Sequence, residues 1–168
     1  AVAFLKDFPN SPRVPAVLDT MVEVITGPDG PDCRLSELEP PKLLQLAQVL
    51  HRKAFYKRAL EVAIRGLESQ SEGPAQTSLA WIAGRSSMFL NNPGAALDHF
   101  KSIKDKASVE YTEGLFRSLL IEFRKKNYYR IIDFANEILS RPNIDKIQLG
   151  TRYYLWRALV ALNDPKKE

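Results

Sequence analysis

The chain has 168 residues, of which 45% are hydrophobic, and its 24 Lys and Arg against 20 Asp and Glu leave a formal charge of +4. This length suffices for a buried core, whereas the longest apolar runs fall far short of the roughly eighteen residues that a membrane-spanning helix requires. The small positive charge is not concentrated, and it therefore does not favour nucleic acid as a partner.

The N-terminal 40 residues predict a partial helical hairpin and a loop. Residues 1–26 contain the end of one helix, a turn at the sequence FPNSP and a second helix from about Arg13 to Thr26. The sequence GPDGPDC, which begins at Gly27, holds two Gly and two Pro in seven residues, and no helix continues through such a segment. We therefore expect a loop or an internal boundary over residues 27–40.

Repeated helix–turn–helix segments are predicted over residues 41–168. In each segment apolar residues recur at intervals of three and four, which is typical of amphipathic helices. Three complete hairpins and the first helix of a fourth are expected. The segments that carry this pattern are 46–67, with a turn at 53–55; 79–103, with a turn at 91–93; 115–139, with a turn at 126–127; and 149–165, which has only a first helix.

The period of these hairpins is measured by aligning the turns. The middle of the first helix is then occupied by Ala47, Gly84, Leu119 and Trp156, at spacings of 37, 35 and 37 residues. Equivalent positions of the second helices, occupied by Ala59, Ala96 and Ile131, repeat the spacings of 37 and 35. A single hairpin cannot bury its apolar faces alone, and stacked neighbours create a continuous core.

This pattern resembles the tetratricopeptide repeat (TPR) family. That family has a small residue in the middle of the first helix, an Ala early in the second and another small residue near its end. Leu119, Ile131 and Trp156 depart from the pattern, and a Sel1-like or other helical-hairpin repeat is the competing family. The matching residues are Ala47, Ala59, Ala63 and Gly66 in the first hairpin and Gly84, Ala96, Phe100 and Ile103 in the second; the third hairpin matches more loosely, with Tyr128, Ile131 and Ala135 at the corresponding positions.

The TPR resemblance implies an all-α fold, a right-handed superhelical α-solenoid of stacked antiparallel helix hairpins. The chain begins inside a helix without the features of a signal peptide, so we expect it to be an internal piece of a longer solenoid. The turn at FPNSP is similar to turns in TPR proteins of the bacterial cell envelope. This second resemblance implies a periplasmic or envelope-associated location rather than a cytoplasmic one.

No pattern in the sequence indicates catalysis. The single cysteine, Cys33, and the two histidines, His51 and His99, are too few for a zinc site. Glycine spacing does not fit a phosphate-binding loop, and Ser86 and Ser87 lie inside a predicted helix rather than at a nucleophile elbow. We therefore expect a protein that is not an enzyme and that has no metal and no cofactor.

The resemblance also implies a concave groove lined by the first helices. In the family, the residues three before and one, four and five after the mid-helix position point into this groove. Aromatic residues and Arg are enriched where binding energy concentrates, so the set predicts a site for a protein or peptide that is acidic and partly apolar. The candidate groove residues are Gln48, Arg52, Trp81, Arg85, Met88, Phe116, Leu120, Arg124, Tyr153 and Arg157; the same rule also selects Leu44, His51, Phe89, Phe123 and Val160.

The leading hypothesis is a non-catalytic protein–protein interaction scaffold in a bacterial envelope or motility assembly. The alternative is the superhelical, non-catalytic region of a larger enzyme such as a lytic transglycosylase. Binding of single-stranded RNA through the Arg and aromatic residues is a third class of function. Exposed solenoid ends also predict self-association.

Overall fold

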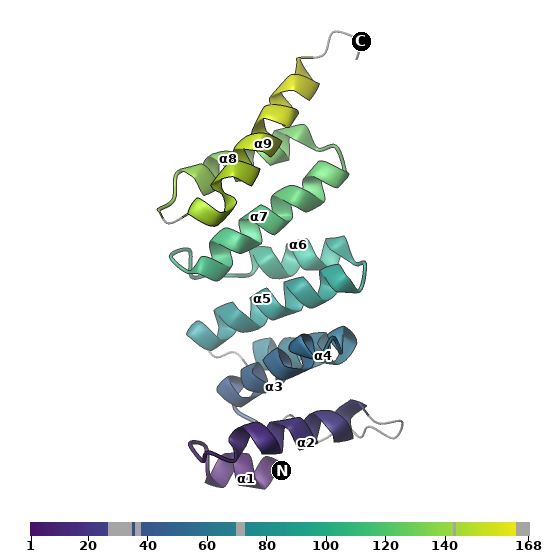
Figure 1. Cartoon of the computed structure of the whole chain (residues 1–168), viewed down its shortest axis with the longest axis vertical. Helices are drawn as coiled ribbons and strands as arrows, with labels where there is room; N and C mark the ends of the chain where they lie inside the picture. Colours follow the sequence, from purple (N-terminus) through teal and green to yellow (C-terminus); the bar gives the residue numbers. More distant parts are fainter. Residues whose placement is uncertain (27–34, 36–37, 70–72, 143, 164–168) are drawn as a thin grey trace. The chain divides into compact units, whose positions relative to one another are not determined.

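The computed structural model describes residues 1–26, 35, 38–69, 73–142 and 144–163, and within these ranges it contains nine α-helices and no strand (Figure 1). The predicted all-α class is confirmed. Contacts divide the chain into two compact units, Ala1–Ile103 and Lys104–Glu168, called unit 1 and unit 2 below. None of the helices in the described part of the chain combines the length and the apolar character needed to cross a membrane.

Unit 1 contains six helices. Neighbours in the chain pack against one another from α2 to α6, and α3 also packs against α5. Pro40, Pro74 and Pro93 stand in the first turns of α3, α5 and α6, where the amide that proline lacks has no partner within the helix. The helices are α1 (Val2–Asp7), α2 (Val14–Thr26), α3 (Pro40–Arg52), α4 (Tyr56–Glu68), α5 (Pro74–Phe89) and α6 (Pro93–Lys101).

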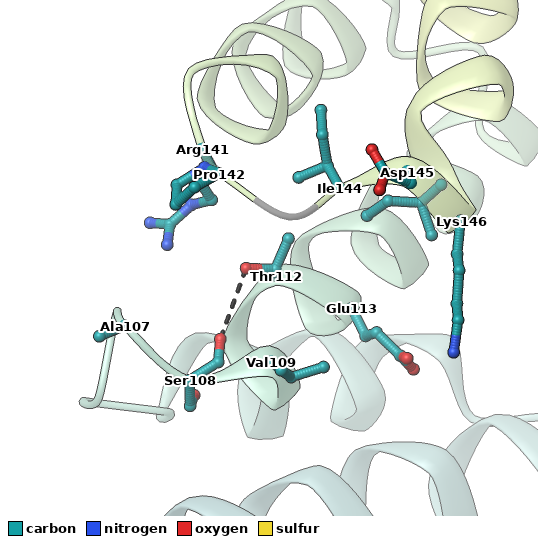
Figure 2. A pocket seen from close by; sticks show the side chains of 11 residues that line it. Ala107, Ser108, Val109, Thr112, Glu113, Arg141, Pro142, Ile144, Asp145 and Lys146 are labelled. Carbon is teal, nitrogen blue, oxygen red and sulfur yellow. Dashed lines mark hydrogen bonds between the residues drawn. The ribbon is translucent and has the colours of Figure 1, made fainter.

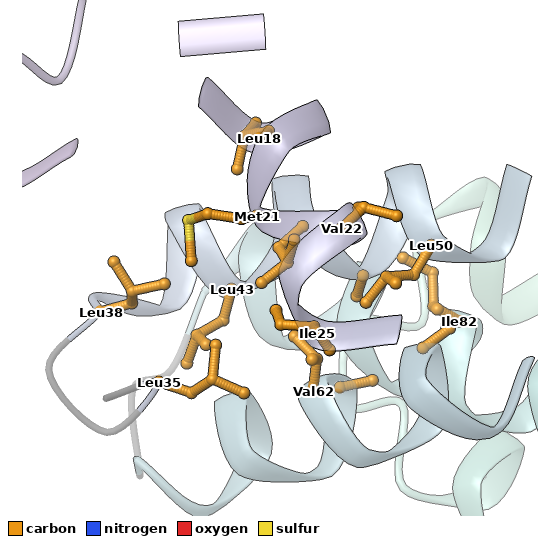
Figure 3. Close-up of a cluster of buried hydrophobic side chains, with 14 of the residues drawn as sticks. Leu18, Met21, Val22, Ile25, Leu35, Leu38, Leu43, Leu50, Val62 and Ile82 are labelled. Atoms are coloured by element: carbon orange, nitrogen blue, oxygen red, sulfur yellow. The ribbon is translucent and has the colours of Figure 1, made fainter. Parts of the chain in front are cut away.

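The core of unit 1 joins the N-terminal helices to the first two hairpins. Met21 and Val22 of α2 lie against side chains of α3 and α4 (Figure 3). Leu46 and Leu50 of α3 are completely buried in the same cluster, as is Ala59 of α4. The partial hairpin at the N-terminus is therefore part of this unit rather than a separate domain.

Unit 2 contains three helices: α7 (Val109–Arg124), α8 (Tyr128–Leu139) and α9 (Asp145–Leu162). Helix α8 packs against both α7 and α9, and α7 also contacts α9. The core brings together Leu119 of α7, Ile131 and Ile138 of α8 and Ala158 of α9, all of which are fully buried.

The three hairpin turns share one backbone geometry. Ala54, Asn91 and Lys126 have left-handed φ angles of 64°, 57° and 59°, and they are spaced 37 and 35 residues apart. In each turn the next amide returns to a carbonyl of the first helix, from Phe55 to Leu50 at 3.0 Å, and the same bond recurs from Asn92 to Ser87 and from Asn127 to Glu122. This is the Schellman ending of a helix, and it repeats the sequence period in the backbone.

Small residues allow close helix contacts in unit 1. A Cβ atom added to Gly84 would lie 2.3 Å from Cε1 of Phe100 in α6, and one added to Gly66 would lie 2.7 Å from Cδ1 of Leu79 in α5. Neither position leaves room for a methyl group unless the neighbour moves. The absence of a side chain at Gly84 therefore allows the ring of Phe100 in α6 to pack directly against α5.

The helices and turns agree with the sequence pattern with two differences. Helices α5, α7 and α9 begin four to six residues before the segments in which the apolar period is visible, because their first turns are rich in polar residues. Trp156 occupies the aligned mid-helix position, yet it is 58% exposed, whereas Ala47 and Leu119 are fully buried. Most of the predicted loop over 27–40, including Cys33, lies outside the described residues.

Candidate functional site

The C-terminal end of α5 carries a partly exposed aromatic cluster. The rings of Tyr56 and Phe89 are stacked, with centroids 4.2 Å apart and an interplanar angle of 5°. The imidazole of His51 meets both rings edge-on, at 5.2 Å from Tyr56 and 5.7 Å from Phe89. Three helices therefore supply this cluster: α3 the histidine, α4 the tyrosine and α5 the phenylalanine.

A cation lies on the same face of α5. The guanidinium carbon of Arg85 is 5.6 Å from the centroid of the Trp81 ring. Arg85 stands four positions after Trp81 and four positions before Phe89 along α5. Residues four apart lie on one helix face, so Trp81, Arg85 and Phe89 form a continuous stripe. Together with His51 and Tyr56 they form what we call the aromatic–basic patch.

The imidazole of His51 is held in place and kept neutral at pH 7. Its Nδ1 atom lies 3.1 Å from Oγ of Ser86, within hydrogen-bond distance. Burial, and then the positive charge of Arg85, lower the pKa of His51 from its ordinary value of 6.5. The residue therefore contributes an aromatic surface at neutral pH, and an added negative charge nearby would favour its protonation.

The patch is partly exposed, and charged residues lie beside it. Phe89 is 56% exposed and Phe55, beside Tyr56 in the chain, is 42% exposed. Arg52 at the end of α3 is exposed, and the next residue, Lys53, pairs with Asp19 at 2.8 Å. Large exposed aromatic side chains beside a cation are the features of a surface that binds another molecule.

The other candidate groove residues of unit 1 lie around this patch. Gln48 and Arg52 are exposed, and Met88 is half-buried. Leu44, which the same rule selects, packs against the core of unit 1. Only part of the selected stripe is therefore surface, and its role in binding stays a prediction.

The candidate residues of unit 2 lie on α7 and α9. Phe116 and Leu120 are half-buried, and Arg124 is exposed. On α9, Nη1 of Arg157 donates to the hydroxyl of Tyr153 at 3.2 Å, and its guanidinium lies 6.0 Å from the ring centroid. The candidate groove residues thus lie in two separate units, and a single groove that would join those of unit 1 to those of unit 2 stays a prediction.

Unit 2 also contains a cavity of about 540 Å³. Ser108, Thr112 and Glu113 at the start of α7 face Ile144 and Lys146 at the start of α9 across it (Figure 2). Both acidic and basic side chains line the cavity, so it selects neither an anion nor a cation.

Arg141, which also lines this cavity, holds neighbouring helices together. Its guanidinium donates to the carbonyl of Lys106 and to Glu137, which also accepts a 2.7 Å bond from the hydroxyl of Tyr111. The guanidinium lies 4.5 Å from the centroid of the Tyr111 ring. Because these donors are used within the unit, Arg141 is a structural residue, and we do not regard the cavity as the functional site.

Sequence reasoning missed the role of Tyr56. The groove rule applies to the first helices of the hairpins and does not select Tyr56, whereas the structure stacks its ring on the exposed Phe89. The available signal was its position, because it is the first residue of α4, directly after the turn.

No metal-binding cluster of three or more His, Cys, Asp or Glu side chains occurs among the described residues. Comparisons of the chain with protein-family models, with curated proteins and with solved structures give no match.

Proposed function

We propose that this chain is a non-catalytic scaffold that binds a segment of another protein through the aromatic–basic patch of unit 1. In this proposal the chain is a right-handed TPR-like solenoid, and the first helices of its hairpins provide the binding face. The observation that carries it is the stripe of Trp81, Arg85 and Phe89, which presents two accessible aromatic rings and a cation on one face of α5.

The repeated turns support the solenoid. Three hairpins with the same left-handed residue and the same return hydrogen bond, at spacings of 37 and 35, are repeats of one structural unit. Repeats of this kind typically expose an extended surface for binding, because each unit contacts only its neighbours.

The chemistry of the patch favours an acidic segment with apolar side chains. Arg85 can bind a carboxylate with two parallel hydrogen bonds, and the exposed ring of Phe89 can cover an aliphatic or aromatic side chain. His51 lies beside Arg85, so a carboxylate bound there would raise the pKa of the imidazole and favour its protonation. The expected partner is therefore a peptide in which acidic and large apolar residues are near neighbours.

The test uses fluorescein-labelled peptides of alternating Asp or Glu and Leu or Phe, with charge-reversed versions that carry Lys. Fluorescence anisotropy should show binding of the acidic peptides alone, and Arg85→Ala or Phe89→Ala should weaken it by about tenfold or more. The matched control is Tyr129→Ala, since Tyr129 is a 72% exposed aromatic residue of α8 in unit 2.

Equal binding of acidic and basic peptides, or equal losses in the control variant, would refute the proposal. The same experiment with single-stranded oligouridylate tests the RNA hypothesis. RNA binding through Arg and aromatic residues would weaken steeply as the salt concentration rises.

A further inference from the structure

Helix α9 exposes a long apolar face. Its members are spaced by three and four residues, so they form one stripe along the helix. Tyr154 and Leu155, by contrast, pack against the core of unit 2. The stripe, called the outer face of α9 below, consists of Leu149 at 82% exposed, Tyr153 at 47%, Trp156 at 58%, Leu159 at 44% and Val160 at 50%.

The exposed positions of α9 can be compared with the aligned positions in the three complete hairpins. Asn163 follows Lys126 by 37 residues, so the sequence period aligns it with Ala54, Asn91 and Lys126, although it is the C-cap residue of α9 and its φ is −94°. Seven residues before these four aligned positions stand Ala47, Gly84, Leu119 and Trp156. Four residues before them stand Leu50, Ser87, Glu122 and Leu159.

Both positions are buried in each complete hairpin. Ala47, Leu119, Leu50 and Ser87 are fully buried, and Glu122 is 8% exposed. Gly84 faces the ring of Phe100 in α6, and Leu119 shares a buried cluster with Ile131 of α8. Trp156 and Leu159 therefore occupy positions that are buried in the complete hairpins.

The size of Trp156 restricts the helix that can cover it. In the second hairpin the first helix has Gly84 and the second has the large Phe100, so a small residue faces a large one. On α9 the large residue is on the first helix. By analogy with the contact of Gly84 and Phe100, close packing favours Gly or Ala on the covering helix opposite Trp156.

Charge restricts the covering helix further. After Asp145, at its first position, α9 contains no acidic residue. Exposed Arg152, three residues after Leu149 and four before Trp156, lies on the stripe itself, and exposed Arg157 lies at its border. Two copies of α9 packed together would bring these cations near one another, which disfavours self-association through this face. Acidic residues bordering an apolar stripe would complement it.

We propose that the outer face of α9 is a docking site for an amphipathic helix that has Gly or Ala opposite Trp156 and Asp or Glu along its borders. The helix packs along α9 as α8 packs along α7. This inference concerns unit 2 and does not depend on the proposed function of the aromatic–basic patch in unit 1.

The first experiment is a selection from a displayed library of helical peptides. Positions facing α9 vary among Gly, Ala and Leu, and border positions vary between Glu and Lys. We expect enrichment of peptides with small residues in the centre and Glu at the borders. Enrichment of Lys-bordered peptides, or no enrichment, would overturn the proposal.

The second experiment measures docking with a selected peptide and a Trp81→Phe protein, in which Trp156 is the remaining tryptophan. Docking should shift the Trp156 emission to shorter wavelength and reduce its quenching by acrylamide. Trp156→Ala and Leu159→Glu should each weaken binding by about tenfold or more. Because Trp156→Ala removes the fluorescent reporter, its binding is measured by the anisotropy of a labelled peptide. Arg157→Glu should weaken binding of the Glu-bordered peptide and strengthen that of its Lys-bordered counterpart.

The controls separate docking from misfolding and from self-association. Tyr129→Ala should bind the peptide normally, and circular dichroism should show unchanged helix content in every variant, because the altered side chains are largely exposed. If binding survives Trp156→Ala and Leu159→Glu, or if light scattering shows a dimer that these variants dissociate, the proposal is wrong.

Discussion

Substitution of Gly84 by Ala tests the close contact between α5 and α6. The added Cβ would lie 2.3, 2.6 and 2.9 Å from three ring atoms of Phe100, all far below an ordinary carbon–carbon contact. Phe100 is 3% exposed and its ring lies 5.5 Å from that of Trp81, so it has little space into which to move. Overpacking of this kind costs about 1–3 kcal/mol, whereas replacing Gly by Ala inside a helix gains about 1 kcal/mol.

We therefore expect Gly84→Ala to destabilise unit 1 by up to about 2 kcal/mol, which is the overpacking cost less the gain in helix propensity. Urea titration followed by Trp81 emission, in a Trp156→Phe background, measures this free energy of unfolding. Gly94→Ala is the matched control. Its Cβ would meet only Oδ1 of Asn92, at 3.7 Å, so it should leave unit 1 unchanged or slightly more stable.

A double variant identifies the cause. Phe100→Leu removes the ring atoms that the new methyl group would touch, so its combination with Gly84→Ala should cost less than the sum of the two separate changes. The steric argument would be refuted if Gly84→Ala raised the urea midpoint as Gly94→Ala does, or if the two changes were additive.

The remaining predictions concern a turn, a buried hydroxyl and pH. Ala54→Gly should stabilise unit 1 by about 0.5–1 kcal/mol, because glycine adopts the left-handed φ of 64° without strain. The control, Ala59→Gly inside α4, should destabilise unit 1. Equal effects of the two changes in urea titrations would contradict this prediction. The hydroxyl of Ser87 is buried and has no hydrogen-bond partner among the described residues, so Ser87→Ala should raise the free energy of unfolding by about 1 kcal/mol, and a loss of stability would show that the hydroxyl is satisfied. Burial lowers the pKa values of His51 and His99 below 6.5, so the unfolded chain binds more protons than the folded one as pH falls below 6.5. Stability should therefore decrease from that pH down to the folded pKa values, and the urea midpoint of a variant with both histidines changed to Gln should not show this decrease.

The hairpin repeat could be predicted because local chemistry specifies it. The apolar residues at intervals of three and four define helices, and Pro93 and the Asn pair before it mark a turn that the structure contains. Turn positions that no glycine marks, such as Ala54 and Lys126, were still located correctly by the change in periodicity. The starts of α5 and α7 were not, because polar first turns carry little of the apolar period.

The candidate surface could be predicted only in part. The groove rule that the TPR resemblance implies selects Trp81, Arg85 and Phe89, which share one face of α5 because residues four apart lie together on a helix. It does not select Tyr56, because the stacking of this ring on Phe89 depends on how α4 crosses α5. Such a contact joins residues 33 positions apart, and no periodicity within a single helix contains it.

Sequence alone thus determined the all-α class, the period and the turns, since these follow from helix propensity and the spacing of apolar residues along the chain. Tertiary structure decided which of two apolar positions became core and which became surface. Leu119 and Trp156 occupy the same place in the repeat, yet Leu119 is covered by α8 and Trp156 is 58% exposed. The difference arises because burial depends on a neighbouring helix, and the position of a residue within its own helix does not specify that neighbour.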